Sequence, residues 1–157
     1  AYRMANNTGS YLLLIELNKG REIHYGSLKQ HLRRGYYVYV GSAMNHLRQR
    51  VHRHIDYKDR FAENPKGKRV EHWHIDRLLV YGNIKMALLL PNTNKIEEEI
   101  SEMVSRFFKA VPSFGATDCV KVDSNLYCLR TVEDFHFITR KALELNWENK
   151  RGLEVES

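Results

Sequence analysis

The order of apolar and polar positions predicts a small number of buried strands. Residues 10–17 (SYLLLIEL) form a nearly continuous apolar run, which is typical of a central strand covered on both faces. Residues 36–40 are rich in tyrosine and valine, and residues 84–90 form a second strongly apolar run that ends at Pro91. Both segments are therefore predicted to be strands.

Turn residues divide the first third of the chain. Asn18-Lys19-Gly20 is a strong turn signal, so residues 21–25 are predicted to return antiparallel to residues 10–17 as a hairpin. Residues 26–34 are polar and basic, which indicates a connector with at most a short helical turn.

A basic helix is predicted to follow the turn at Gly41-Ser42. Its expected buried stripe consists of four residues at helical spacing, Leu47, Val51, His54 and Ile55. Residues 56–68 are polar and contain Asn64-Pro65 and Gly67, so this segment is predicted to be a flexible loop.

Three further helices are predicted. The first covers residues 71–79, and the second begins after an N-cap at Asn94, with Glu97 completing a capping box. Its expected core face is Ile96, Ile100, Met103, Val104 and Phe107. Thr131 and Asp134 open a C-terminal helix, whose apolar residues can pack on the domain or on a second copy of the chain: Phe135, Ile138, Ala142 and Leu145.

The mixture of strands and helices predicts the α/β or α+β class, with a small, mixed but largely antiparallel central sheet flanked by helices. Short strands are also expected at residues 119–122 and 126–129. The 157 residues suit a single domain, with a core at about 9–130 and a helical extension at about 131–150.

The composition of the chain narrows the range of expected partners. The formal charge of +6 and the pI of about 9.3 favour an anionic partner such as nucleic acid. Neither apolar run approaches the ~20 residues of a membrane helix, so no membrane association is expected. Cys119 and Cys128 have no second pair to complete a metal cage, and we expect reduced cysteines in a cytoplasmic protein.

Two tyrosine motifs carry a family resemblance. Gly9-Ser10-Tyr11 and Tyr39-Val40-Gly41, followed by Leu47-x-x-Arg50-Val51-x-x-His54, resemble the GIY-YIG nuclease domain. The chain is most similar to a mainly archaeal branch of that superfamily, some of whose members are fused to endonuclease III. The segments that match this branch are residues 37–43, 47–54, 73–76, 95–108 and 114–119. The two motifs lie farther apart than in typical members, because residues 21–34 intervene.

The resemblance implies catalytic roles for Tyr11, Tyr39, Arg50 and His54. The tyrosines would meet on neighbouring strands in a cleft and help to activate water, although a phenol with a pKa of about 10 is a poor base unless a cation lowers that value. Arg50 would grip a phosphate bidentately, and His54 would orient the reacting groups. The alternatives are core tyrosines with hydroxyls at the rim, a solvated arginine and a half-buried histidine.

The same resemblance implies a divalent cation, Mg²⁺ or Mn²⁺, held by few protein oxygens. Among Glu97-Glu98-Glu99, Glu97 is accounted for by capping and Glu98 points away from the apolar stripe. Glu99 lies at the edge of the stripe and matches the Glu-x-Glu-Ile pattern of the branch that the chain resembles, so it is predicted to be both the metal ligand and a catalytic residue. Alternatively, all three simply favour the positive N-terminus of a helix.

These observations favour a metal-dependent endonuclease that cuts or nicks DNA and is linked to DNA repair or processing. DNA is preferred to RNA as the partner, and a repair enzyme is a second expected partner. The predicted nucleic-acid contacts are Arg48, Arg53, Lys66, Lys68, Arg69 and His74. The alternatives are a noncatalytic DNA- or RNA-binding module and a basic domain with a protein partner. The sequence leaves the oligomeric state open.

Overall fold

The computed structural model describes residues 7–63, 73–117 and 119–156, and the side chains of residues 7–60, 73–117 and 119–150. Its main sheet has five antiparallel strands in the order β5-β1-β4-β7-β6. The strands are β1 (Gly9–Leu17), β4 (Gly35–Ala43), β5 (Asn83–Pro91), β6 (Lys109–Ala110) and β7 (Leu126–Leu129). The helices are α2 (Leu47–Glu63), α3 (His74–Leu79), α4 (Glu97–Ser105) and α5 (Val132–Glu156). The α+β class with an antiparallel sheet flanked by helices is therefore confirmed.

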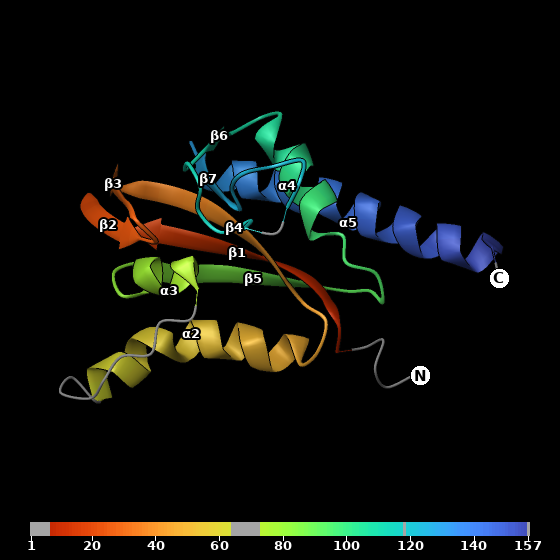
Figure 1. Cartoon of the computed structure of the whole chain (residues 1–157), viewed down its shortest axis with the longest axis horizontal. Helices are drawn as coiled ribbons and strands as arrows, with labels where there is room; N and C mark the ends of the chain where they lie inside the picture. Colours follow the sequence, from red (N-terminus) through yellow and green to blue (C-terminus); the bar gives the residue numbers. More distant parts are fainter. Residues whose placement is uncertain (1–6, 64–72, 118, 157) are drawn as a thin grey trace.

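Helices cover both faces of the sheet, so β1 and β4 are buried from two sides (Figure 1). Alternation along each strand sends successive side chains into two different cores. Tyr11, Leu13 and Ile15 enter a core with α2 and α3, whereas Leu12 and Leu14 enter a core with α4 and α5. The continuous apolar run of β1 follows directly from this double coverage.

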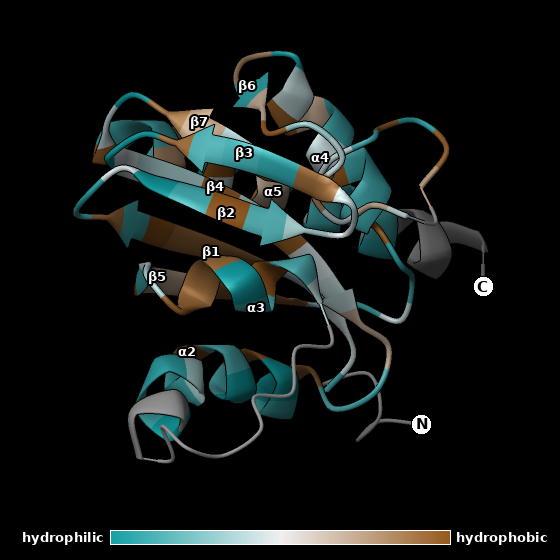
Figure 2. Cartoon of the chain, turned by 60° about the vertical axis from the view of Figure 1, so that its left-hand side comes forward, coloured by the Kyte–Doolittle hydropathy of each residue, from teal (hydrophilic) through white to brown (hydrophobic). Residues whose placement is uncertain are grey.

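The predicted hairpin between residues 10–17 and 21–25 is wrong. The segment Arg21–Tyr25 (β2) pairs instead with Leu28–Leu32 (β3), in a separate two-stranded sheet. Gly26 turns this hairpin at a φ of 55°, in the left-handed region. The residues expected to form a connector therefore contain a strand. In Figure 2 the hairpin lies across β1 and β4 on the side of α3, and Ile23, Tyr25 and Leu32 bury its underside in the first core.

The helix after β4 begins at Leu47 as predicted, but it continues through part of the expected loop as far as Glu63. Leu47, Val51 and His54 are buried, whereas Ile55 is 46% exposed. The predicted strand at residues 119–122 is absent from the described residues of that segment, while Leu126–Leu129 is confirmed.

The helix after β5 also differs from the prediction. It begins at Glu97, with Ile96 as N-cap and without a side-chain cap, so Asn94 does not cap it. Phe107 is exposed, and Phe108 takes its place in the core. The remaining four residues of the expected core face are buried: Ile96, Ile100, Met103 and Val104.

The C-terminal helix α5 packs on the domain. Phe135, Ile138 and Ala142 are fully or almost fully buried against the second core, and Leu145 packs at its edge. In the described part of the chain, no helix is both long and apolar enough to cross a bilayer.

The two isoleucines Ile138 and Ile55 give a matched test of this packing. Ile138→Ala removes a fully buried side chain, so we expect a loss of about 2–5 kcal/mol in the free energy of unfolding. Ile55→Ala should change it by no more than about 0.5 kcal/mol, because the side chain is half exposed. Urea denaturation followed by circular dichroism measures both, and equal losses would contradict the layer arrangement.

Candidate active-site cleft

A cleft of about 540 Å³ opens where β1, β4, α2, α3 and the start of α4 meet. Four of the five residues predicted to be catalytic line it or contact a residue that does: Tyr11, Tyr39, Arg50 and, through Tyr11, His54. The other lining residues are Gly41, Ser42, Met44, Trp73, His74, Lys95, Glu97, Gly115, Ala116, Thr117 and Asn125.

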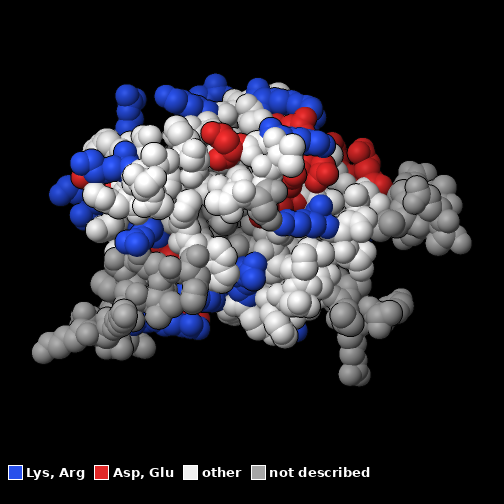
Figure 3. All heavy atoms as spheres, viewed as in Figure 1, with Lys and Arg blue, Asp and Glu red and all other residues white. Residues whose placement is uncertain are grey.

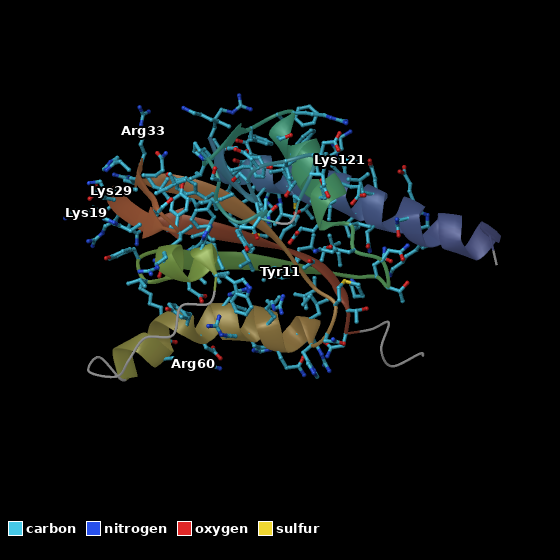
Figure 4. All side chains as sticks on the ribbon, viewed as in Figure 1. Tyr11, Lys19, Lys29, Arg33, Arg60 and Lys121 are labelled. Atoms are coloured by element: carbon cyan, nitrogen blue, oxygen red, sulfur yellow. The ribbon has the colours of Figure 1, made fainter. Side chains whose placement is uncertain are left out.

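Gly41 makes room for the Tyr11 ring. The two residues are cross-strand partners in β1 and β4, and a Cβ at position 41 would lie 2.4 Å from the Tyr11 hydroxyl oxygen. Any side chain there would displace the phenol. The glycine of the Tyr39-Val40-Gly41 motif therefore leaves space for Tyr11 on the neighbouring strand. The Tyr11 side chain lies between the sheet and α2 (Figure 4).

The Tyr11 hydroxyl lies 2.9 Å from Nε2 of His54, and both side chains are buried. Burial lowers the pKa of His54 to about 4, an effect that Arg53 and Arg50 strengthen and that Asp76 opposes. His54 is therefore neutral at pH 7. With the proton assigned to Nδ1, Nε2 accepts the hydrogen bond that the Tyr11 hydroxyl donates.

Asp76 completes a buried chain of groups behind the tyrosine. Its Oδ1 lies 3.9 Å from Nδ1 of His54, and its two carboxylate oxygens accept hydrogen bonds from Arg53 at 3.1 and 3.2 Å. Asp76 and His54 are twenty-two positions apart, so their spacing in the sequence provides no reason to link them. The order Tyr11, His54, Asp76 nevertheless resembles the nucleophile, base and carboxylate of hydrolytic triads.

Burial and neighbouring positive charges have opposing effects on the pKa values of Tyr11 and Tyr39. Burial raises the pKa of Tyr11, Arg50 opposes this rise, and Glu97 adds to it. Burial also raises the pKa of Tyr39 well above its usual value, and the neighbouring Tyr11 adds to that effect. The two rings are 6.3 Å apart between centroids. Both tyrosines are therefore neutral phenols, and proton removal from either needs an adjacent acceptor.

Arg50 is held at the wall of the cleft. Its Nη1 donates to the Ser42 carbonyl oxygen at 2.7 Å, and its guanidinium lies over the Trp73 ring, 4.9 Å from the centroid. A guanidinium has five N–H donors, so this anchoring still leaves donors for a phosphate in the cleft.

The three glutamates at the start of α4 have separate environments. Glu97 is 7% exposed and lines the cleft, while Glu98 accepts the backbone N–H groups of Val120 and Lys121. Glu99 is exposed in a different groove, which lies between α4 and α5. The structure thus does not bring Glu99 to the tyrosines.

The helical position of Glu97 explains this difference. Glu97 shares the buried face of α4 with Ser101, four residues on, and the Ser101 hydroxyl donates to Asn125 Oδ1 at 2.8 Å. Glu99 shares its face with Glu102 and Met103 instead. The prediction that Glu97 caps a helix did not indicate that this residue lines the cleft. The signal for that position was Ser101, a buried polar residue on the same face of α4.

The predicted nucleic-acid contacts are distributed differently. Arg53 is turned inward to Asp76 and lies over Trp73, so the fold itself uses this cation. Arg48 is exposed on α2 and is not among the residues that line the cleft. His74 lines the cleft and accepts the Gly115 backbone N–H on Nδ1 at 2.9 Å. The remaining three, Lys66, Lys68 and Arg69, are outside the described residues.

A single carboxylate suits a weakly coordinated hard cation. Among the described residues there is no group of three or more His, Cys, Asp or Glu side chains that could hold a metal. Glu97 is buried at the cleft wall, with Cys119 Sγ 3.8 Å from its Oε2. One buried carboxylate oxygen pair fits Mg²⁺, which keeps several waters and takes its other ligands from substrate phosphate.

Comparison with known proteins places the chain in a family. The family model described as "Domain of unknown function DUF123" matches residues 10–147, so the chain belongs to this family. The match includes the cleft residues from Tyr11 to Asn125. Searches of curated proteins and of solved structures give no significant match.

Gly41→Ala tests the room for Tyr11. We expect the free energy of unfolding to fall by about 1–3 kcal/mol, because the new methyl group overlaps the buried phenol. Gly20→Ala is the matched control, since its Cβ would lie 3.2 Å from the end of the His31 side chain and 3.6 Å from the Leu32 carbonyl oxygen, without overlap. Thermal unfolding of the two variants measures the difference, and a smaller loss for Gly41→Ala than for the control would contradict the steric account.

His54 predicts a pH dependence of stability. Its pKa of about 4 in the folded state lies below 6.5 in the unfolded chain, so the unfolded chain binds more protons between these values. Stability should therefore fall as the pH drops from 6.5 towards 4, by an amount of the order of 3 kcal/mol. Urea denaturation across this range should show a flatter profile for His54→Gln, whereas His52→Gln, on the exposed side of α2, should keep the wild-type slope.

Proposed function

We propose that this protein is a metal-dependent endonuclease that hydrolyses DNA phosphodiester bonds. The observation that carries the proposal is the buried hydrogen bond between Tyr11 and His54 at the floor of a cleft that also holds Arg50 and Glu97. A phenol with a neutral acceptor behind it can accept a proton, a guanidinium can stabilise charge on phosphate, and a carboxylate can hold a cation, and phosphodiester hydrolysis can use all three. The resemblance of the tyrosine motifs to GIY-YIG nucleases supports the same assignment.

In the proposed reaction, the oxygen of Tyr11 accepts a proton from the attacking water while the Tyr11 hydroxyl proton passes to Nε2 of His54. This coupled transfer avoids a free phenolate, which burial disfavours. The carboxylate of Asp76 lies 3.9 Å from Nδ1 and stabilises the imidazolium that forms. The water oxygen bonds to phosphorus, the bond to the leaving oxygen breaks, and that oxygen takes a proton from solvent.

Arg50 binds the phosphate and stabilises the charge that develops on its non-bridging oxygens. Glu97 would hold Mg²⁺ or Mn²⁺. When bound, such a cation polarises the phosphate and neutralises charge on the leaving oxygen. Tyr39 and His74 line the same cleft and would position the substrate and its water. DNA repair or processing is the proposed setting, and DNA is favoured over RNA as the substrate.

Neighbouring glutamates provide the sharpest test. Glu97→Gln should lower the rate of nicking of supercoiled plasmid in Mg²⁺ or Mn²⁺ by roughly a hundredfold or more, because it removes the only carboxylate among the described residues that line the cleft. Glu99→Gln, two residues away but in another groove, should stay within roughly twofold of the wild type.

Tyr11→Phe should lower the rate of plasmid nicking by about a hundredfold or more, because it removes the hydroxyl that relays the proton to His54. Its far-ultraviolet circular dichroism spectrum should be unchanged.

The alternative is a noncatalytic DNA- or RNA-binding module. If the wild type binds DNA but nicks no plasmid with either metal, and Glu97→Gln binds as tightly as the wild type, the endonuclease proposal is overturned in favour of this module. Loss of nicking in Glu99→Gln but not in Glu97→Gln would overturn the assignment of the metal ligand.

A further inference from the structure

A second cavity, of about 470 Å³, lies beside the β2–β3 hairpin. Its walls come from the end of β3 and the turn into β4 on one side, and from β6, β7 and the segment after β6 on the other. The lining residues are Gln30, His31, Leu32, Arg33, Arg34, Tyr37, Lys109, Ala110, Val111, Pro112, Cys128 and Leu129. We call this cavity the hairpin groove.

The hairpin groove is positively charged. Arg33, Arg34 and Lys109 line it, and within the described part of the chain no aspartate or glutamate lines it. Figure 3 shows Lys and Arg side chains gathered over the hairpin and β6, while Asp and Glu side chains gather over α4. Arg33 points away from the outer end of the hairpin in Figure 4.

These three cations also differ from others on the surface. Lys29 lies 3.5 Å from Glu22, and Arg130 lies 3.6 Å from Asp134. Arg33, Arg34 and Lys109 are exposed, and none of them forms an ion pair with a carboxylate in the described part of the chain. Their charges are therefore not neutralised by the protein and remain available to an external anion.

Two of the groove cations, Lys109 and Arg33, act on one thiol, that of Cys128. Burial raises the pKa of Cys128, and Lys109 and Arg33 act against this rise. These two cations come from β6 and from the end of the hairpin, so they approach the thiol from the two walls of the groove. Cys128 is only partly buried and can serve as a reporter of occupancy.

The hairpin groove is next to the candidate active site. Tyr37 lines the groove and Tyr39 lines the cleft, and the two residues lie on the same face of β4. Two residues along a strand span about 6.7 Å, so the groove and the cleft open over neighbouring parts of β4. The segment after β6 also connects the groove with the cleft, because Val111 and Pro112 line the groove while Gly115 lines the cleft.

We propose that the hairpin groove binds the phosphate backbone of the same nucleic-acid strand whose scissile phosphate occupies the cleft, a few nucleotides to one side. This inference rests on the proposed function, since it identifies a second contact with the same substrate. The groove contributes affinity and direction without reading bases, because its arginines and lysine contact phosphate oxygens, which carry no sequence information. The intervening hairpin thereby sets on which side of the cut the enzyme holds the strand.

The test compares DNA binding by two triple variants. Arg33→Ala/Arg34→Ala/Lys109→Ala removes the groove cations, and Arg106→Ala/Arg140→Ala/Lys141→Ala removes three cations of α4 and α5 as a matched control. Fluorescence anisotropy measures binding of labelled single strands of four and of twelve nucleotides, with Ca²⁺ in place of Mg²⁺ to suppress cleavage. Circular dichroism checks that each variant is folded.

We expect the groove variant to bind the long strand roughly tenfold more weakly than the wild type at low salt, and the control to bind it normally. The slope of log affinity against log salt should fall by about 2, since each lost single-strand contact removes about 0.7. The groove variant and the wild type should bind the four-nucleotide strand with equal affinity. In a Cys119→Ser background, only the long strand should protect Cys128 from a thiol reagent.

Equal binding of the long strand by the groove variant and the wild type would overturn the inference while leaving the proposed function intact. Binding of inorganic phosphate or an acidic peptide in the groove by a protein that binds neither DNA length would overturn both. Nicking activity is measured separately. A protein that binds long DNA through the groove but never cuts it would overturn the endonuclease function and the scissile phosphate in the cleft, and would leave the groove as a backbone contact of the binding module.

Discussion

The absence of a side chain at Gly41 determines the arrangement of the cleft. Gly41 leaves space on β4 for the phenol of Tyr11, the residue paired with it on β1. Because the phenol can lie flat over that glycine, its hydroxyl reaches His54 on α2 rather than solvent. The distance between sheet and helix is therefore matched to the length of one tyrosine side chain, and Asp76 and Arg53 are positioned behind the histidine.

Burial has two opposite consequences in this site. It keeps Tyr11 protonated, and it keeps His54 neutral and able to accept a proton. The same low-dielectric setting strengthens the interaction of Asp76 with any imidazolium that forms. The negative charge of Asp76 is in turn balanced by Arg53, which explains why an arginine that looks like a surface cation in the sequence is held inside the fold.

Local patterns predicted much of the fold. The continuous run of β1 indicated coverage on both faces, and the stripe of Leu47, Val51 and His54 predicted the orientation of α2. Failures arose where pairing is nonlocal. The turn at residues 18–20 fits a hairpin with β1, but β1 is already paired on both edges by β4 and β5. Residues 21–25 therefore pair with the next segment.

The site was predictable to the extent that its residues share one stretch of sequence. Tyr39, Arg50 and His54 follow one another through a strand and a helix, and the structure brings them to one place with Tyr11. Glu97 and Asp76 were missed because their roles depend on helix rotation, and one helix start displaced by a few residues changes which carboxylate faces inward. A carboxylate two positions away, Glu99, then belongs to another surface.

The β2–β3 hairpin interrupts the two tyrosine motifs, but it is not an independent attachment. The Tyr25 hydroxyl donates to the Pro112 carbonyl oxygen at 2.6 Å, and the Tyr25 ring packs on Phe114, which contacts Tyr39. The hairpin thus packs behind Tyr39 and His74, which line the cleft. Excising this hairpin would remove the support behind these two side chains, so a change to the outer surface of the hairpin would also change the shape of the cleft.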